Sequence, residues 1–157
     1  MLAQLQVYQT KQYILKGLLE QLSGEEIYQV VENVNNSIYW LVGHMTGARL
    51  SMLKLLDIEY KLDLDLQPFR KSASSSNISD GPEFSVMLKH FDKMGDMLYE
   101  NLQNLDTNVL GRPMKYIISD KMVTVGDNLR FLIFHEDYHI GQIALIIRMK
   151  GKKGIGV

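Results

Sequence analysis

The sequence predicts an all-α fold, a bundle of four long helices, and three observations lead to this prediction. Apolar residues recur at helical spacing in four long stretches of the 157-residue chain. No run of alternating apolar and polar residues is strong enough to build a sheet. One long connection, residues 57–80, interrupts the helical pattern. The length suits one domain with a substantial core, so we assign residues 1–151 to this domain and residues 152–157 to a C-terminal tail.

Composition and charge exclude several classes of function. Hydrophobic residues make up 46% and charged residues 22% of the chain, as in ordinary globular proteins. The net charge is -1 without a long run of one sign, which argues against nucleic acid or an anionic membrane as a partner. The chain has no cysteine, so disulfides, a cysteine nucleophile and a thiolate metal site are excluded.

The distribution of apolar residues predicts the cellular location. The first twenty residues mix charged and apolar side chains and lack the continuous apolar core of a secretory signal. No apolar stretch reaches the roughly 18 residues that a membrane span needs. We therefore expect a cytoplasmic protein.

Two long helices are expected before the long connection. The first covers residues 2–22, where apolar residues follow one helical face: Leu5, Tyr8, Leu15, Leu18, Leu19 and Leu22. Residues 23–26 resemble a capping box and predict a short helical piece through Val31. Asparagines at 33, 35 and 36 can then cap a longer helix over about residues 36–56.

The long connection has a natural use in a bundle. Residues 57–80 contain Pro68 and the serine-rich tract 71–77, which predicts a flexible loop. A structureless connection of this length is uncommon in a compact domain. In a bundle it can cross from one end to the other, so that the next helix need not be the antiparallel neighbour of the preceding one.

Two further long helices follow. Asp80 and Pro82 predict the start of the third, which ends near Leu105. Residues 106–123 contain Gly111 and Pro113, and Met114 to Ile118 then predict a brief segment that is either extended or irregular. Thr124 and Asp127 predict the cap of the last helix, over about residues 125–150, and Gly151 its end. This helix is apolar nearly all round, so we expect it to be buried, with part of its surface against a second subunit.

The last helix carries a pair of histidines. His135 and His139 stand four residues apart and therefore share a helical face. Neutral imidazole is a good ligand for Zn, Ni, Cu or Fe, so the pair forms half of a metal site. The pair also matches the H-E-x-x-H pattern of zinc peptidases, with Glu136 as general base. Such peptidases take their third ligand from downstream, whereas residues 140–157 contain no His, Asp or Glu. This disfavours the peptidase interpretation.

A third ligand must therefore come from upstream, where two histidines are available. His44 shares a helical stripe with Leu41 and Ala48, and its face should look inward. His90 lies one position off the apolar stripe of its helix and is interpreted as a solvated helix-edge residue. His44 is the better candidate.

Two segments, Asn36–His44 and Phe134–Ile143, together with the long break between them, resemble the DinB-like superfamily of bacterial proteins. The resemblance implies a four-helix bundle with a right-handed crossover between helices 2 and 3. It also implies a three-histidine metal site, which transfers to His44, His135 and His139, with coordination positions left to water. Members are often dimers. Characterised relatives include metal-dependent transferases of a low-molecular-weight thiol, and the family name does not imply contact with DNA.

Four neighbours of the histidines have open interpretations. Trp40 is expected to pack in the core and to wall the site, and Asn36 to cap its helix. Gln142 either supports His139 from behind or is a surface or interface glutamine. Glu136 is either a proton shuttle or a solvated or interface residue.

Two hypotheses of function follow. Three neutral protein ligands with an open position typify a catalytic metal site. The first hypothesis is an enzyme with one divalent metal per chain, Zn or Ni, that activates water or a thiol co-substrate for transfer or hydrolysis on a small molecule. The second is a non-catalytic, metal-binding, dimeric stress-related protein. A pocket beside the metal, rimmed by residues 57–80 and 106–123, would favour the enzyme.

Overall fold

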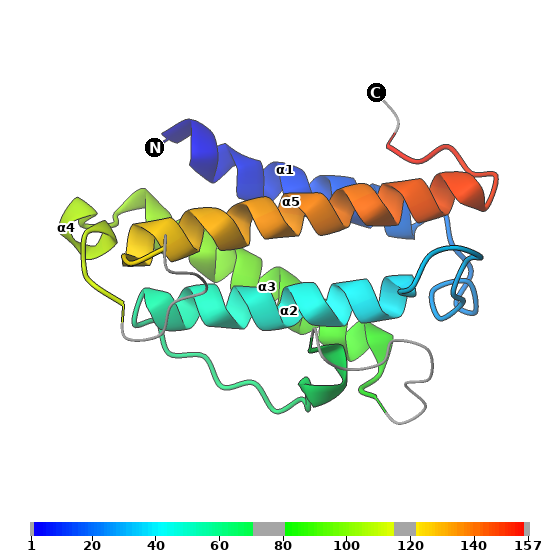
Figure 1. Cartoon of the computed structure of the whole chain (residues 1–157), viewed down its shortest axis with the longest axis horizontal. Helices are drawn as coiled ribbons and strands as arrows, with labels where there is room; N and C mark the ends of the chain where they lie inside the picture. Colours follow the sequence, from blue (N-terminus) through cyan, green and yellow to red (C-terminus); the bar gives the residue numbers. More distant parts are fainter. Residues whose placement is uncertain (1, 71–80, 115–121, 156–157) are drawn as a thin grey trace.

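The computed structural model describes residues 2–70, 81–114 and 122–155, with side chains from Tyr8 onward. Its elements are α1 (Leu2–Leu19), α2 (Ile38–Leu55), a 3-10 turn η1 (Gln67–Phe69), α3 (Phe84–Gln103), the short α4 (Thr107–Leu110) and α5 (Val125–Met149) (Figure 1). These described residues contain no strand beyond an isolated bridge between Pro113 and Thr124. The all-α prediction with four long helices is confirmed. Within the same residues, no helix is both long and apolar enough to cross a membrane.

The four long helices pack in a closed ring. α2 contacts α3 and α5, and α1 contacts the same two helices from the other side. Figure 1 shows α2 and α3 running from right to left, whereas α1 and α5 run from left to right. Helices 2 and 3 of the bundle are therefore parallel neighbours, and the connection between them must return along the bundle, as the sequence predicted.

The first half of the chain departs from the prediction in two places. Residues 24–28 form turns and residues 29–31 are irregular, so the predicted short helical piece is absent here. The backbone N–H of Ser23 does donate to the Glu26 carboxylate at 2.7 Å, which is one half of a capping box, but no helix follows. The predicted cap at Asn36 is also wrong. Ser37 caps α2, because its backbone is extended and its hydroxyl accepts a hydrogen bond from the Trp40 N–H.

The later boundaries agree more closely with the sequence. α5 begins with the predicted capping box of Thr124 and Asp127, and Gly151 follows its end with φ 77°, a conformation that favours glycine. α3 begins at Phe84, just after Pro82. The serine-rich tract 71–77, the cap at Asp80 and residues 115–118 of the extended segment lie outside the described residues.

The crossover packs against α2 at η1, about halfway along the connection. Phe69 in η1 is buried, and its ring lies directly over Gly43. A methyl group at Gly43 would overlap this ring, so only glycine at this position of α2 lets the crossover approach so closely. This contact brings the backbone of Phe69 beside His44, the next residue along α2.

Candidate metal centre

Three histidines from two distant segments meet between α2 and α5. His44 comes from α2, while His135 and His139 come from successive turns of α5. The Nε2 atom of His135 lies 3.1 Å from Nε2 of His44 and 2.9 Å from Nε2 of His139. One nitrogen from each residue lies within 4.8 Å of the others. The i,i+4 spacing and the packing of α2 on α5 are sufficient to cause this convergence.

Hydrogen bonds on the far side of two rings fix their tautomers. Nδ1 of His44 lies 2.7 Å from the carbonyl oxygen of Phe69, which can only accept, so Nδ1 carries the proton. Nδ1 of His139 donates likewise to Oε1 of Gln142 at 2.6 Å. The Gln142 amide N–H₂ donates to the Tyr138 hydroxyl at 3.1 Å, which holds the amide in this orientation. Both histidines therefore turn the lone pair of Nε2 toward the cluster.

This donor set fits a divalent metal ion. The lone pairs of His44 and His139 both face Nε2 of His135. A proton at His135 can bridge to only one of them at a time, whereas a metal ion takes all three nitrogens as ligands. Neutral imidazoles with tautomers fixed by outer hydrogen bonds are the usual form of protein metal ligands.

Aromatic rings flank each imidazole. The buried Trp40 ring stacks on His44 with centroids 4.7 Å apart and an angle of 14° between the planes. Phe131 stacks on His135 at 5.8 Å. Tyr138 meets the ring of His139 nearly edge-on at 5.1 Å. These contacts restrict ring rotation and leave the Nε2 atoms pointing at one another.

Burial favours the neutral form at the innermost ligand. His139 is buried, and this burial lowers its pKa, although the hydrogen bond with Gln142 acts in the opposite direction. His44 and His135 are only half-buried, so the cluster is open to solvent on one side. An ion held there would keep room for a further ligand.

Glu136 does not lie with the histidines. It is fully buried, and its two carboxylate oxygens accept hydrogen bonds from Arg49 at 2.7 and 3.0 Å. The expectation of a solvated or interface residue is therefore wrong. One residue along a helix turns the side chain by about 100°, which carries Glu136 from the histidine side of α5 into the core. Both oxygens are already occupied, and this gives no support to a general base of peptidase type.

Arg49 was missed by the sequence analysis. It is fully buried, donates a further hydrogen bond to the Phe91 carbonyl at 2.8 Å and lies over the Phe91 ring. A methyl group at Gly95 would overlap its guanidinium, so this glycine makes room for it. Arg49 is the one arginine of the apolar α2, and Glu136 is the one glutamate of α5. Because buried charges must pair, this combination could have predicted the ion pair.

His90 lies elsewhere, on α3. Its Nδ1 is 2.6 Å from the Tyr60 hydroxyl, and its Nε2 is 3.4 Å from the Asp63 carboxylate. It is therefore a partly buried anchor for the crossover rather than a solvated edge residue. The group of possible metal ligands found among the described residues contains the other three histidines and not His90.

Comparisons with known proteins agree with this architecture. The DinB superfamily model matches residues 8–143. YfiT from Bacillus subtilis, described as a probable metal-dependent hydrolase with an unusual four-helix bundle topology, has a TM-score of 0.71 at 16% identity, and the match covers 96% of this chain and 87% of YfiT. A DinB-like protein of Bacillus subtilis, YjoA, has a TM-score of 0.65 at 16% identity, covering 99% and 96%. No curated protein matches the chain. Because the family model spans most of its length, the chain belongs to the DinB superfamily.

Proposed function

We propose that this protein binds one divalent metal ion through His44, His135 and His139 and acts as a metal-dependent hydrolase on a small molecule. The observation that carries this proposal is the convergence of three Nε2 atoms, two of them with tautomers fixed by outer hydrogen bonds. When bound, such an ion acts as a Lewis acid and lowers the pKa of a water or thiol at its open position. The description of YfiT as a probable metal-dependent hydrolase supports water as the nucleophile.

Contacts within the chain hold two of the proposed metal ligands in position before an ion binds. The Phe69 carbonyl holds His44, and Gln142 holds His139, so neither ring has to reorient when the ion binds. The buried pair of Arg49 and Glu136 ties α2 to α5 beside the histidines, because Glu136 directly follows His135 and Arg49 lies just over one turn beyond His44. A low-molecular-weight thiol remains the alternative nucleophile, and it would have to arrive as a co-substrate because the chain has no cysteine.

Metal content tests the proposal directly. Imidazole donors accept several divalent ions, of which we propose Zn or Ni. Freshly purified protein should contain about one metal ion per chain by elemental analysis. Alanine variants of His44, His135 and His139 should each lose it, and His90→Ala should retain it. Loss of metal in His90→Ala, or retention in any of the other three, would contradict the proposed ligand set.

A non-catalytic metal protein is the second candidate, and one observation favours it. Two cavities lie in the described part of the chain, one beside Tyr8 and Leu129 and the other beside Lys54 and Tyr60, and neither is lined by a histidine of the cluster. Hydrolysis of ester, amide or phosphoester substrates by the metal-loaded protein, abolished in His44→Ala, would support the enzyme. Stoichiometric metal with no turnover on any of these substrates, and no consumption of added thiol, would support the second candidate.

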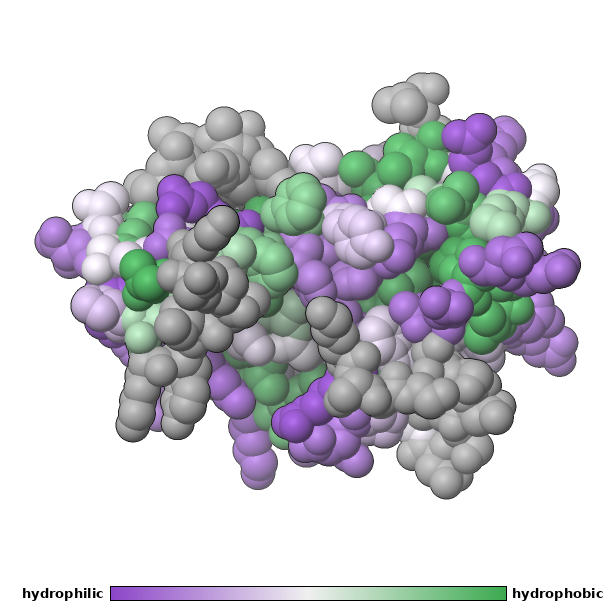
Figure 2. Space-filling model, in the orientation of Figure 1, coloured by the Kyte–Doolittle hydropathy of each residue, from purple (hydrophilic) through white to green (hydrophobic). Residues whose placement is uncertain are grey.

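We also propose that the protein forms a homodimer through α5. Phe134, Tyr138, Leu145 and Met149 form an exposed stripe on this helix. Their numbers are symmetric about Gly141 and Gln142, so an antiparallel pair of α5 helices would bring Phe134 opposite Met149 and Tyr138 opposite Leu145. Figure 2 shows apolar surface gathered at the right, where the second half of α5 lies. Gly141 has open space beside it, which would allow close approach.

Light scattering tests this interface. Leu145→Lys should give a monomer, because it places a charge in the centre of the apolar stripe. Gln103→Lys is the matched control, since it adds the same charge on the exposed face of α3, which packs on α1 and α2. A monomeric wild-type protein, or equal effects of the two variants, would contradict the proposed interface.

A further inference from the structure

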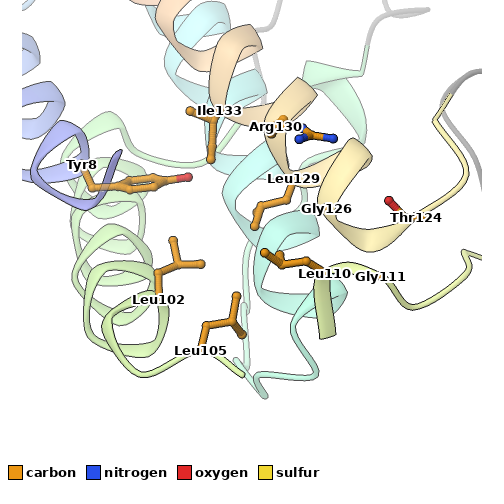
Figure 3. Close-up of a pocket in the computed structure, with 10 residues that line it drawn as sticks. All are labelled: Tyr8, Leu102, Leu105, Leu110, Gly111, Thr124, Gly126, Leu129, Arg130 and Ile133. Atoms are coloured by element: carbon orange, nitrogen blue, oxygen red, sulfur yellow. The ribbon is translucent and has the colours of Figure 1, made fainter. Parts of the chain in front are cut away.

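A cavity of about 350 Å³ lies between the first half of α5 and the ends of α1, α3 and α4. Figure 3 shows five aliphatic side chains pointing toward its interior, with the ring of Tyr8 entering from α1: Leu102, Leu105, Leu110, Leu129 and Ile133. Tyr8, Leu102 and Leu129 are buried. The volume is at the low end of the range of about 300–1,000 Å³ for small-molecule sites.

This cavity is separate from the metal centre. Ile133 lines it from α5, and His135 follows only two residues later. Two residues along a helix turn the side chain by about 200°, so the cavity and the histidines occupy opposite flanks of α5. The cavity faces α1, and the histidines face α2. None of its lining residues belongs to the histidine cluster or to the aromatic rings around it.

The polar side chains of the lining already have partners within the chain. The Tyr8 hydroxyl donates to the sulfur of Met52 at 3.0 Å. The Thr124 hydroxyl and Asp127 satisfy each other in the capping box of α5. The Arg130 guanidinium donates to Asp127 at 2.7 Å and is largely exposed at the rim. The side chains that point into the cavity are therefore mainly aliphatic, and the polar side chains around it do not need a polar ligand as a partner.

We propose that this cavity binds a neutral, apolar small molecule with a short alkyl chain. The volume corresponds to roughly twelve heavy atoms, if each takes the ~30 Å³ of a liquid water molecule. A charged head group is disfavoured, because the one charged side chain of the lining, Arg130, lies at the rim and is already paired with Asp127, so a carboxylate there would compete with the Asp127 carboxylate. This binding does not depend on the metal centre.

Two probes of equal chain length test the proposal, 1-octanol and octanoate. Methyl groups of Leu102, Leu129 and Ile133 should shift in NMR spectra when 1-octanol is added to the full-length protein. Octanoate should bind about tenfold or more weakly, because its carboxylate must lose water at the mouth of an aliphatic cavity, where Arg130 is already paired with Asp127. Shifts that are absent from these methyls, or octanoate binding as tightly as octanol, would overturn the inference.

A filling variant provides an independent test. Leu105→Trp should lower 1-octanol affinity about tenfold or more, because the indole would occupy the space. Leu22→Trp is the matched control, since Leu22 is also a half-buried leucine but packs against the hydrophobic cluster that contains Trp40 and Ile143, away from the cavity. Equal octanol affinities of the two variants would contradict the assignment. The methyl shifts of the wild-type protein decide the question even where a variant fails to fold.

Discussion

The two flanks of α5 differ in how their polar groups are satisfied. On the α2 flank, the lone pairs of His44 and His139 converge on one nitrogen of His135. On the α1 flank, the polar groups around the cavity, such as Tyr8 and Arg130, already bond within the chain. The α2 flank therefore suits a bound cation. The α1 flank provides an apolar cavity that suits an uncharged molecule.

This difference shows that hollow space is a poor guide to chemistry in this molecule. The described cavity lies on the flank whose polar groups are complete. The candidate metal centre lies where the Nε2 atoms of three imidazoles converge, and its histidines line neither of the two cavities. Substitutions that alter one flank and leave the other intact therefore test whether the two flanks differ in this way.

The largest effect should come from the buried ion pair beside the histidines. Glu136→Leu leaves the Arg49 guanidinium buried without its carboxylate, and this should lower the free energy of unfolding by about 3–5 kcal/mol in urea denaturation. The double variant Arg49→Met, Glu136→Leu should recover most of this loss, because no charge is left unpaired. Similar stability of single and double variants would show that the loss comes from packing rather than from the unpaired charge.

A glycine pair on α2 gives the next largest effect. Gly43→Ala should destabilise the protein by about 1–3 kcal/mol and weaken metal binding, because the methyl group displaces Phe69, whose carbonyl holds His44. Gly47→Ala is the control one turn later, where the added methyl finds only Leu66 at 3.8 Å. It should stabilise the helix by up to about 1 kcal/mol. Thermal unfolding and metal titration of both variants distinguish these outcomes.

Local patterns account for what the sequence could predict. Apolar periodicity located the four long helices, and the Thr124 and Asp127 pair located the start of the last one. The approach of His44 to His135 and His139 was expected from the inward face of α2 and from resemblance to a family. These features depend on side-chain type and spacing, which the sequence contains directly.

Interactions between distant residues account for most of what was missed. Glu136 and its partner Arg49 are 87 positions apart, and no local spacing relates them. The hydrogen bond from His44 goes to the backbone carbonyl of Phe69. Because every residue has a backbone carbonyl, the sequence does not indicate which one will accept this bond. Asparagine and serine are both good caps, so residue type alone did not distinguish Asn36 from Ser37. Ser37 is the cap in the structure, with an extended backbone.

A smaller effect is expected at the residue behind the innermost ligand. Gln142→Ala removes the acceptor from Nδ1 of His139 and should weaken metal binding about 10–100-fold with little change in stability. Tyr138→Phe removes only the hydroxyl that orients the amide, so it should weaken binding less. Competition with a chelator measures both. Unchanged affinity in Gln142→Ala would mean that the stacked rings alone hold His139 in place.

The pH dependence of ligand binding separates the two flanks. Metal binding requires neutral imidazoles, so affinity should be highest above pH 6.5, the ordinary histidine pKa, and should fall by about tenfold per unit as each competing proton binds at lower pH. Burial lowers the pKa of His139, so competition there begins only below this value. Octanol affinity should stay constant between about pH 8 and pH 5.5, since burial raises the pKa of Tyr8 and hydrogen bonds lower that of Asp127. Titration of the same sample with both ligands checks this, and equal pH dependence on the two flanks would remove the physical distinction between them.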